Sequence, residues 1–273
     1  MFRHSWIVLA AGVLACSDKA VLRYRPRRDA VHHYVMTMRY AREDAGIVAG
    51  SRRSTQVWTI YYTQFGRFTD PRIATRELAL RVDSAQLQSN DVAPDLSSMR
   101  GQAISAFLDG QGQLLRTERD VSARLTPDLV FRLHAIAAAT APSFSQQPVE
   151  AGDRWTMARR AALEDFGTGS DSLAELQLDA TLGAIRESAN DKVAEVGIQG
   201  PLPTRELSVN TSLGPLPARS SGTVIGQYRF SLPRGVMVSQ ELTDTRLLVT
   251  DAPGVGRDTL LSRLVTHTTI RLQ

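Results

Sequence analysis

Cys16 is the side chain whose placement in the sequence predicts a definite chemical reaction. It is the single cysteine of the 273 residues, so the chain can form no internal disulfide. An apolar run from Trp6 to Ala15 precedes it, after a short head that carries Arg3 and His4. Spanning a bilayer takes roughly 20 apolar residues, so this shorter run is typical of the middle of a secretory signal. The thiol therefore lies where such a signal ends.

The stretch Val13-Leu14-Ala15-Cys16 resembles the bacterial lipoprotein signal, or lipobox. In that family the cysteine thiol receives a diacylglyceryl group through a thioether, a signal peptidase cuts just before it, and the new amino terminus is acylated. The resemblance implies that residues 1–15 are removed and that Cys16 becomes the first residue of a lipid-anchored chain, since two or more acyl chains make a stable anchor. A plain secretory signal with an incidental cysteine is the alternative.

The residues after the cysteine bear on where the protein is held. In the lipoprotein family an aspartate directly after the lipidated cysteine retains the protein at the inner membrane, whereas here Ser17 follows and Asp18 comes one residue later. The resemblance thus implies the periplasmic face of the outer membrane in preference to the inner membrane. Residues 16–30, with Lys19 and several arginines, predict a basic tether that is either drawn to an anionic membrane surface or simply solvated.

Residues with catalytic or metal-binding chemistry are scattered in the rest of the sequence. His32 and His33 are adjacent, so on a strand they point to opposite faces and do not share a metal ion. His134 and His267 are remote from them, and no Gly-x-Ser-x-Gly elbow occurs. The glycine-rich turn at residues 167–170 lacks the Lys-Ser/Thr of a phosphate-binding loop. We expect no enzyme activity, no metal site and no other cofactor.

Large apolar side chains on predicted strands form the candidate binding surface. A concave sheet lined by them would hold an acyl chain, because methionine and aromatic side chains fill irregular apolar spaces. Core packing is the alternative role for the same side chains. The candidate lining consists of Tyr34, Met36, Met38, Trp58, Tyr62, Phe107, Tyr228 and Phe230.

These side chains must be positioned by strands, because apolar residues recur with a period of two. The alternation runs through residues 34–40, 56–64, 78–82, 176–182, 196–198 and 224–242. The pair Asp109-Gly110 predicts a tight hairpin turn between residues 101–108 and 113–120. Residues 201–219 contain four prolines and predict either a long loop or an interrupted edge strand.

The period changes at Thr126, where a single amphipathic helix is predicted to begin. Thr126 suits the N-cap, and Pro127 suits the first helical position. Leu133 and Ile136 belong to an apolar stripe, and the helix ends before Pro142. The stripe must cover something, most simply one face of the sheet, and in that place the helix competes with a ligand.

Composition and charge exclude several classes of protein. With 42% hydrophobic and 22% charged residues, the chain can bury a core and is neither disordered nor collagen-like. The formal charge of +4 arises from 32 Lys and Arg interspersed with 28 Asp and Glu, a pattern that indicates no dedicated nucleic-acid binder. Glycines at 101 and 112 recur at 222 and 235 in a similar hairpin pattern, which favours a duplicated meander.

The predicted fold is mainly β, with one or more curved antiparallel sheets built from two similar β-meander halves joined by the helix. Its divisions are the signal peptide at 1–15, the tether at 16–30, a first β half at 31–125, the helix at 126–141 and a second β half at 142–273. The Pro-Val-x-x-Gly-Asp-x-Trp stretch at 148–155 resembles uncharacterised β-rich envelope lipoproteins. The order of the elements is loosely similar to the half-barrel of periplasmic lipoprotein carriers.

We therefore expect a secreted, membrane-anchored envelope lipoprotein that acts as a non-catalytic binding or scaffold module. Its partners are the membrane, through the lipid anchor, and either an acyl-chain ligand or another envelope protein, with no nucleic acid. The alternatives are a lipid or lipoprotein carrier with a hydrophobic groove and an envelope hydrolase. A carrier predicts a dry cavity of about 300–1,000 Å³, whereas a hydrolase predicts convergent polar groups with perturbed pKa values.

Overall fold

The computed structural model describes residues 19–25, 27, 30–45, 52–67, 75–90, 96–119, 125–141, 143–163, 172–188, 190–211, 214–251 and 259–273. Within these residues eleven strands form one antiparallel sheet, and the prediction of a mainly β protein with a single α-helix is confirmed. The elements are β1 (Val31–Asp44), β2 (Arg52–Arg67), β3 (Arg76–Ser89), the 3-10 helix η1 (Ser97–Met99), β4 (Ala103–Leu108), β5 (Leu114–Arg119), α1 (Pro127–Thr140), β6 (Arg154–Leu163), β7 (Ser172–Ser188), β8 (Asp191–Thr211), β9 (Gly214–Ser231), β10 (Val236–Thr250) and β11 (Thr259–Leu272).

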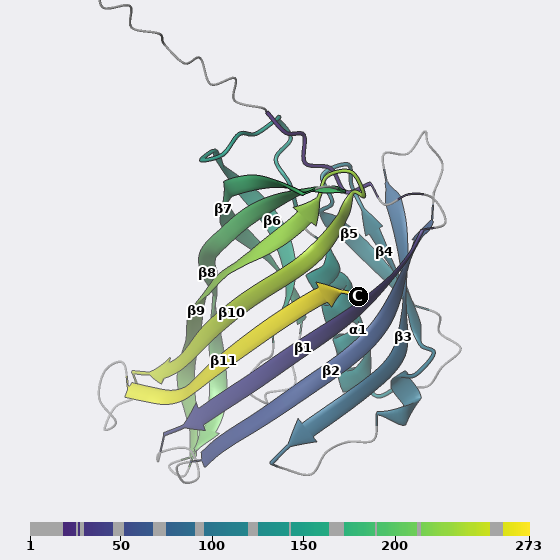
Figure 1. Ribbon diagram of the computed structural model, residues 1–273. Helices are drawn as coiled ribbons and strands as arrows, with labels where there is room; N and C mark the ends of the chain where they lie inside the picture. Colours follow the sequence, from purple (N-terminus) through teal and green to yellow (C-terminus); the bar gives the residue numbers. More distant parts are fainter. Residues whose placement is uncertain are drawn as a thin grey trace, which may run out of the picture.

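The strand order across the sheet is β5-β4-β3-β2-β1-β11-β10-β9-β8-β7-β6. Consecutive strands are neighbours, so the chain forms one meander from β1 to β5 and a second from β6 to β11. The two meanders join where β1 pairs with β11, from Tyr34 opposite Leu272 to Asp44 opposite Ser262. β5 and β6 are the two edges, and α1 connects them. The curved sheet is nearly closed, and α1 lies on its concave side, behind β1 and β2 (Figure 1).

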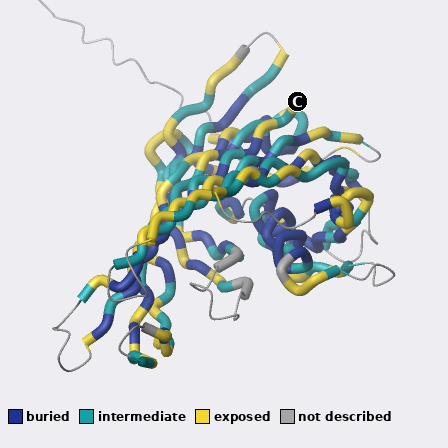
Figure 2. The backbone as a smooth tube through the Cα atoms, turned by 90° about the horizontal axis from the view of Figure 1, so that it is seen from below, coloured by how far each residue is buried: buried dark blue, intermediate teal, exposed yellow. Residues whose placement is uncertain are grey.

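The concave face is built from the apolar row of each strand. On β1, Tyr34, Met36 and Met38 are buried, whereas the residues between them are partly exposed. The buried rows of β1 and β2 oppose each other in register, Tyr34 with Tyr62, Met36 with Ile60 and Met38 with Trp58. The same alternation of buried and more exposed residues runs along the other strands (Figure 2). The period-two pattern therefore identified the inward-facing residues of these strands.

The helix begins where its sequence predicts. Thr126 is the N-cap, and its side chain accepts a hydrogen bond from the Leu129 backbone N–H at 3.5 Å. Pro127 occupies the first helical position, where its missing N–H costs nothing because that group has no partner within a helix. The helix ends at Thr140, whose hydroxyl donates to the carbonyls of the preceding turn.

The helix occupies part of the concave face. Leu133 and Ala137 are fully buried, and they belong to the same apolar core as Trp58 and Leu78 of the sheet. Arg132 is buried as well, so α1 is covered on more sides than an amphipathic stripe predicts, as its mostly dark coil in Figure 2 shows. The interior is therefore a packed core with the helix inside it, and not an open groove.

Residues 19–25 close one end of this interior. Leu22 and Tyr24 are buried, whereas the residues between and beside them are exposed. Ala20 forms a bridge with Val149 through two backbone hydrogen bonds of 2.7 and 2.8 Å. From Ala20 onward, this part of the segment predicted as a basic tether packs on the folded body and is not simply solvated.

The β9–β10 turn holds the same segment in place. The Arg25 backbone N–H donates to the Gly235 carbonyl at 3.0 Å. Gly235 has a φ of +65°, and a Cβ on it would lie 2.4 Å from the Arg25 carbonyl oxygen, so the turn requires glycine. Gly112, at the matching place in the β4–β5 turn, also has positive φ. The two hairpins thus share glycine positions, although β9 and β10 are far longer than β4 and β5.

β8 and β9 run through the region of four prolines. β8 pairs with β7 as far as Gln199, and beyond that residue its pairing continues with β9 alone. The register shifts between Leu202 and Arg205, and Pro217 lies opposite Ser208. Proline is tolerated on an edge because it has no N–H to donate to a neighbouring strand. The interrupted edge strand was the correct alternative, and a second small apolar cluster packs there: Val209, Ala218, Leu248, Leu261 and Leu264.

Candidate functional site

A cavity of about 80 Å³ lies between α1 and the concave face formed by β1 and β6 to β11. We call it the arginine pocket, after Arg159 and Arg246 in its wall. Arg160, Asp244, Tyr40 and two threonines are further polar residues that line it. Its apolar lining consists of Met36, Met38, Phe131, Ala135, Ala138, Ala139, Ala161, Leu176, Leu178, Ile198, Leu202, Val224 and Leu242. The pocket is therefore mostly hydrocarbon, with charged groups at a few points.

Arg159 on β6 is the most unusual group of the pocket. Its side chain is 4% exposed, yet no carboxylate pairs with it among the described residues. One guanidinium nitrogen, Nη2, donates to the Gln240 Oε1 atom at 2.9 Å and to the Ala139 carbonyl at 3.2 Å, whereas Nη1 has no hydrogen-bond partner. Burial lowers the pKa of the Arg159 guanidinium to about 10. The site thus holds a desolvated positive charge without a counter-ion.

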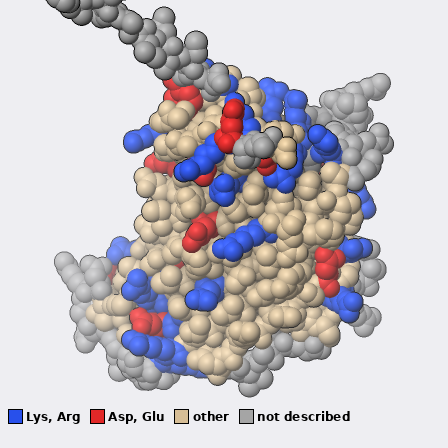
Figure 3. All heavy atoms as spheres, in the orientation of Figure 1, with Lys and Arg blue, Asp and Glu red and all other residues tan. Residues whose placement is uncertain are grey.

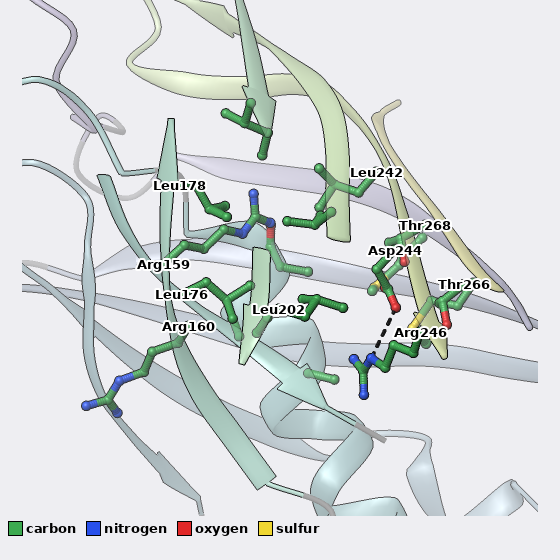
Figure 4. Close-up of a pocket in the computed structure, with 18 of the residues that line it drawn as sticks. Arg159, Arg160, Leu176, Leu178, Leu202, Leu242, Asp244, Arg246, Thr266 and Thr268 are labelled. Carbon is green, nitrogen blue, oxygen red and sulfur yellow. Dashed lines mark hydrogen bonds and ion pairs between the residues drawn. The ribbon is translucent and has the colours of Figure 1, made fainter. Parts of the chain in front are cut away.

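The position of Arg159 follows from strand alternation. Trp155, Met157 and Arg159 share the inward face of β6, opposite Ala180, Leu178 and Leu176 of β7. Arg160 comes next on the strand, and Figure 4 shows its side chain directed away from the leucines among which Arg159 lies. The alternation of β6 in the sequence could have identified Arg159 as a charged residue in an apolar row, but we did not predict it as a site residue.

Arg246 on β10 is the second buried arginine of the pocket, and it has a counter-charge. Its Nε atom lies 3.5 Å from Oδ1 of Asp244, two residues earlier on the same face of the strand (Figure 4). The Arg246 side chain is 7% exposed and the Asp244 side chain 21% exposed. Asp244 is the only carboxylate among the described residues that line the pocket. Arg246 thus has a carboxylate beside it, whereas Arg159 has none among the described residues.

Arg132 on α1 is stabilised in a different way. Its guanidinium lies 4.7 Å from the centre of the Trp58 ring and 5.2 Å from that of Tyr40. Nη1 also donates to the Tyr40 hydroxyl at 2.8 Å. Aromatic faces attract a desolvated cation, so this arginine attaches the helix to β1 and β2.

Tyrosine and phenylalanine side chains fill the other end of the interior, which we call the aromatic end: Tyr24, Tyr34, Tyr62, Phe144 and Phe230. The Tyr34 and Tyr62 rings stack at 5.4 Å, and the Phe144 ring meets that of Phe230 edge-on at 4.6 Å. Gln64 donates to the Tyr24 hydroxyl at 2.6 Å, and the Tyr34 hydroxyl donates to a backbone carbonyl. Burial raises the pKa of the phenols of Tyr24, Tyr34 and Tyr62 above the ordinary 10.0.

The residues of the predicted ligand lining do not form one site. Seven of the eight residues belong to the buried core on the concave side, and Met36 and Met38 line the arginine pocket. Phe107 lies on the opposite face of the sheet, because Ala106 and Leu108 on either side of it point inward. The Arg116 guanidinium lies 4.0 Å from the centre of its ring. The seven core residues are Tyr34, Met36, Met38, Trp58, Tyr62, Tyr228 and Phe230.

The histidines are dispersed, as their sequence positions suggest. Three of them place Nδ1 near a threonine hydroxyl oxygen: His33 near Thr63 at 3.1 Å, His134 near Thr117 at 2.6 Å and His267 near Thr243 at 3.0 Å. In the part of the chain that the structure describes, no group of three His, Cys, Asp or Glu side chains is placed to hold a metal. The glycine-rich turn at 167–170 lies outside the described residues, as do the signal sequence and Cys16.

Comparison with known proteins identifies a fold and no family. The sequence matches no family model and no curated protein. The structure is similar to that of lipovitellin, in a study of its lipid–protein interactions, with a TM-score of 0.57, 10% sequence identity, and coverage of 92% of this chain and 25% of that chain. The fold resembles part of lipovitellin. This chain spans about a quarter of the lipovitellin chain, and at that identity the likeness concerns the fold alone.

A second structural likeness is too weak to use. Salmonella typhi OmpF in complex with daunomycin aligns over 89% of this chain and 98% of that chain at 10% identity, with a TM-score of 0.22 that carries no argument. Among the described residues of this chain, no helix has both the length and the apolar character needed to cross a membrane.

Proposed function

We propose that this protein is a non-catalytic envelope lipoprotein, tethered through Cys16, that binds an acyl chain on the concave face of its sheet. The observation that carries the proposal is the arginine pocket, a cavity with a mostly hydrocarbon lining that lies inside the curved sheet and beside the helix. Ligand sites for amphiphiles are apolar cavities with a few well-placed polar groups. The fold of lipovitellin, a protein studied for its interactions with lipids, supports the same function.

The size of the cavity determines how a ligand would enter. Its volume of about 80 Å³ lies below the roughly 300–1,000 Å³ of typical ligand sites. An acyl chain would therefore take space now filled by flexible or small side chains. Met36 and Met38 supply adaptable side chains on the sheet, and Phe131 and Ala135 line the pocket from α1. We expect ligand binding to displace α1 outward, between the sheet edges β5 and β6.

A binding role fits the polar groups of the pocket better than catalysis. Hydrolysis by a pair of carboxylates needs two of them near each other. The described lining offers Asp244 alone, and that carboxylate faces Arg246. Such a site can hold a ligand by charge and apolar contact.

A cavity-filling variant tests acyl-chain binding. Leu242→Trp fills the pocket from β10, and Leu247→Trp is the control, because Leu247 lies on the same strand with 37% of its surface exposed. We expect Leu242→Trp to weaken binding of a fluorescent fatty acid by about tenfold, since overpacking costs about 1–3 kcal/mol. The control should bind like the wild type. Absence of binding to the wild-type protein, with no lipid found by native mass spectrometry, would exclude the function.

The membrane anchor needs a separate test. In cells, Cys16→Ser should abolish incorporation of labelled palmitate and move the protein from the membrane fraction, at the outer membrane, to the soluble fraction. Ser17→Ala is the control, since it leaves the thiol in place. Unchanged membrane recovery of the Cys16→Ser protein would contradict the anchor while leaving the pocket untouched.

A further inference from the structure

Two linked residues, Arg159 in the wall of the arginine pocket and Gln240 beside it, carry buried hydrogen-bond donors without an acceptor. They are Nη1 of Arg159 and Nε2 of Gln240, and neither has a hydrogen-bond partner among the described atoms. Their side chains are 4% and 2% exposed, and they are joined by the 2.9 Å hydrogen bond from Arg159 Nη2 to Gln240 Oε1. The two free donors are therefore parts of one small polar group inside an apolar core.

A buried donor without an acceptor is costly, and a buried cation without a counter-charge costs more. Water removed from the guanidinium is replaced by one amide oxygen and one backbone carbonyl, that of Ala139. The carboxylate in the pocket, Asp244, is engaged with Arg246 at 3.5 Å and is not within ion-pair distance of Arg159. The group that is missing is an anionic acceptor.

We propose that Arg159 and Gln240 bind the carboxylate of a fatty acid whose hydrocarbon chain lies in the arginine pocket. This inference rests on the proposed function and specifies the headgroup of its ligand. One carboxylate oxygen accepts from Nη1 of Arg159, and the other accepts from Nε2 of Gln240. The chain then runs along Leu178 and Leu242, which line the pocket beside Arg159 (Figure 4).

The chemistry of the site favours a single carboxylate over larger or uncharged heads. A guanidinium and an adjacent amide present donors that match two carboxylate oxygens, and charge-assisted hydrogen bonds of this kind are about twice as strong as neutral ones. A neutral head would leave the Arg159 charge unbalanced. One guanidinium in an apolar cavity balances one negative charge. A headgroup with two negative charges would therefore leave one of them buried without a counter-charge.

The experiment compares palmitate with hexadecanol, which has the same chain and no charge. The full chain carrying Cys16→Ser is used so that no detergent is needed, and binding is measured by isothermal titration calorimetry below the micelle concentration. We expect palmitate to bind about tenfold or more tightly than hexadecanol. Arg159→Met should abolish this preference while still binding the alcohol, whereas Arg186→Met, the control on β7 with 69% of its side chain exposed, should retain it.

The outcomes separate the headgroup inference from the proposed function. If the acid and the alcohol bind wild type equally, the carboxylate site is refuted and acyl-chain binding stands. If neither binds, both proposals fail. Arg159→Met is expected to fold, because an apolar group replaces an uncompensated buried charge. Should it not fold, Gln240→Leu and the wild-type comparison of acid with alcohol decide the question.

Discussion

The two ends of the interior differ in the charge and hydrogen bonding of their buried polar groups. At the aromatic end the five clustered side chains are uncharged, and the Tyr24 and Tyr34 hydroxyls have hydrogen-bond partners at 2.6 and 2.9 Å, whereas the Tyr62 hydroxyl has none among the described atoms. In the arginine pocket, Arg159 is buried to a similar extent with a free N–H and no counter-ion. Both regions are lined by inward-facing rows of the same sheet. A shared fold therefore supplies a neutral, filled end and a charged end with a cavity.

This difference separates a region that stabilises the fold from the region of the proposed ligand site. The aromatic end is covered by residues 19–25 and by the chain near Val149, which are joined to each other. In Figure 3 the surface at the upper end of the molecule carries several basic side chains with acidic ones among them. The pocket lies deeper along the sheet, beside α1. Closure of one end leaves the helix side as the route for a ligand.

Alkaline pH should unfold the protein through ionisation of its buried phenols, most of which lie at the aromatic end, and this is the largest effect that we expect. Burial raises the folded-state pKa of four phenols, those of Tyr24, Tyr34, Tyr62 and Tyr228, above the ordinary 10.0. In the unfolded chain these phenols ionise near 10.0, so the folded state binds more protons, and stability is lost as the pH rises above that value. Burial lowers the pKa of the Arg159 guanidinium to about 10 and also lowers that of Arg76; both act in the opposite sense, but they are two groups against four.

Circular dichroism and tyrosinate absorbance, followed together as the pH rises, test this prediction. We expect one cooperative transition above pH 10 in which ellipticity is lost as tyrosinate appears. Tyr24→Phe should move the transition to higher pH, and Tyr61→Phe, on the outer face with 36% exposure, is the control. Tyrosinate that appears fully while the ellipticity is unchanged would show that these phenols are not buried.

Truncation of the helix core should have the next largest effect. Leu133 of α1 is 0% exposed, so Leu133→Ala should lower the free energy of unfolding by about 2–5 kcal/mol. Leu247→Ala, on the outer face, should change it by less than about 0.5 kcal/mol. Urea unfolding measures both. A loss below about 1 kcal/mol for Leu133→Ala would mean that the helix is not packed in the unliganded protein.

Two glycines, one on β9 and one on β8, differ in the space that surrounds them. A Cβ on Gly226 of β9 would lie 2.2 Å from the Glu241 carbonyl oxygen and 2.6 Å from a methyl carbon of Leu242, whereas one on Gly197 would meet nothing within 4 Å. Gly226→Ala should destabilise the fold by about 1–3 kcal/mol and disturb the pocket. Gly197→Ala should be neutral or slightly stabilising by thermal unfolding. Equal effects would show that the β9–β10 contact can relax.

Substitution of two buried arginines, Arg132 and Arg159, should have the smallest effects. Arg132 stacks on Trp58 at 4.7 Å, so Arg132→Met should cost about 1–2 kcal/mol of unfolding free energy. Arg159→Met should leave stability within about 1 kcal/mol or raise it, because it removes an uncompensated buried charge. Both are measured by urea unfolding without added lipid. A clear loss for Arg159→Met would instead assign that arginine to holding the end of α1 through the Ala139 carbonyl.

Local features of this protein could be predicted from the sequence because they depend on near neighbours. The strand faces follow from alternation, as in Tyr34, Met36 and Met38, and the helix start follows from the cap chemistry of Thr126 and Pro127. The hairpin at Asp109 was likewise predictable, because its carboxylate accepts from nearby backbone N–H groups. Phe107 was assigned to the wrong face, because both faces of β4 carry apolar residues.

The cover over the aromatic end and the charge balance of the arginine pocket depend on contacts between residues far apart in the sequence. The sequence of residues 19–25 does not predict that the segment covers the aromatic end, because it is held there by distant residues: Val149 pairs with Ala20, and Gly235 accepts from Arg25. The alternation of β6 predicts that Arg159 points inward. Whether it meets a carboxylate depends on β10, which lies across the sheet from β6 and on which Asp244 lies beside Arg246. Periodicity is a property of adjacent residues, whereas the balance of buried charge depends on which distant strands meet, and only the assembled sheet decides that.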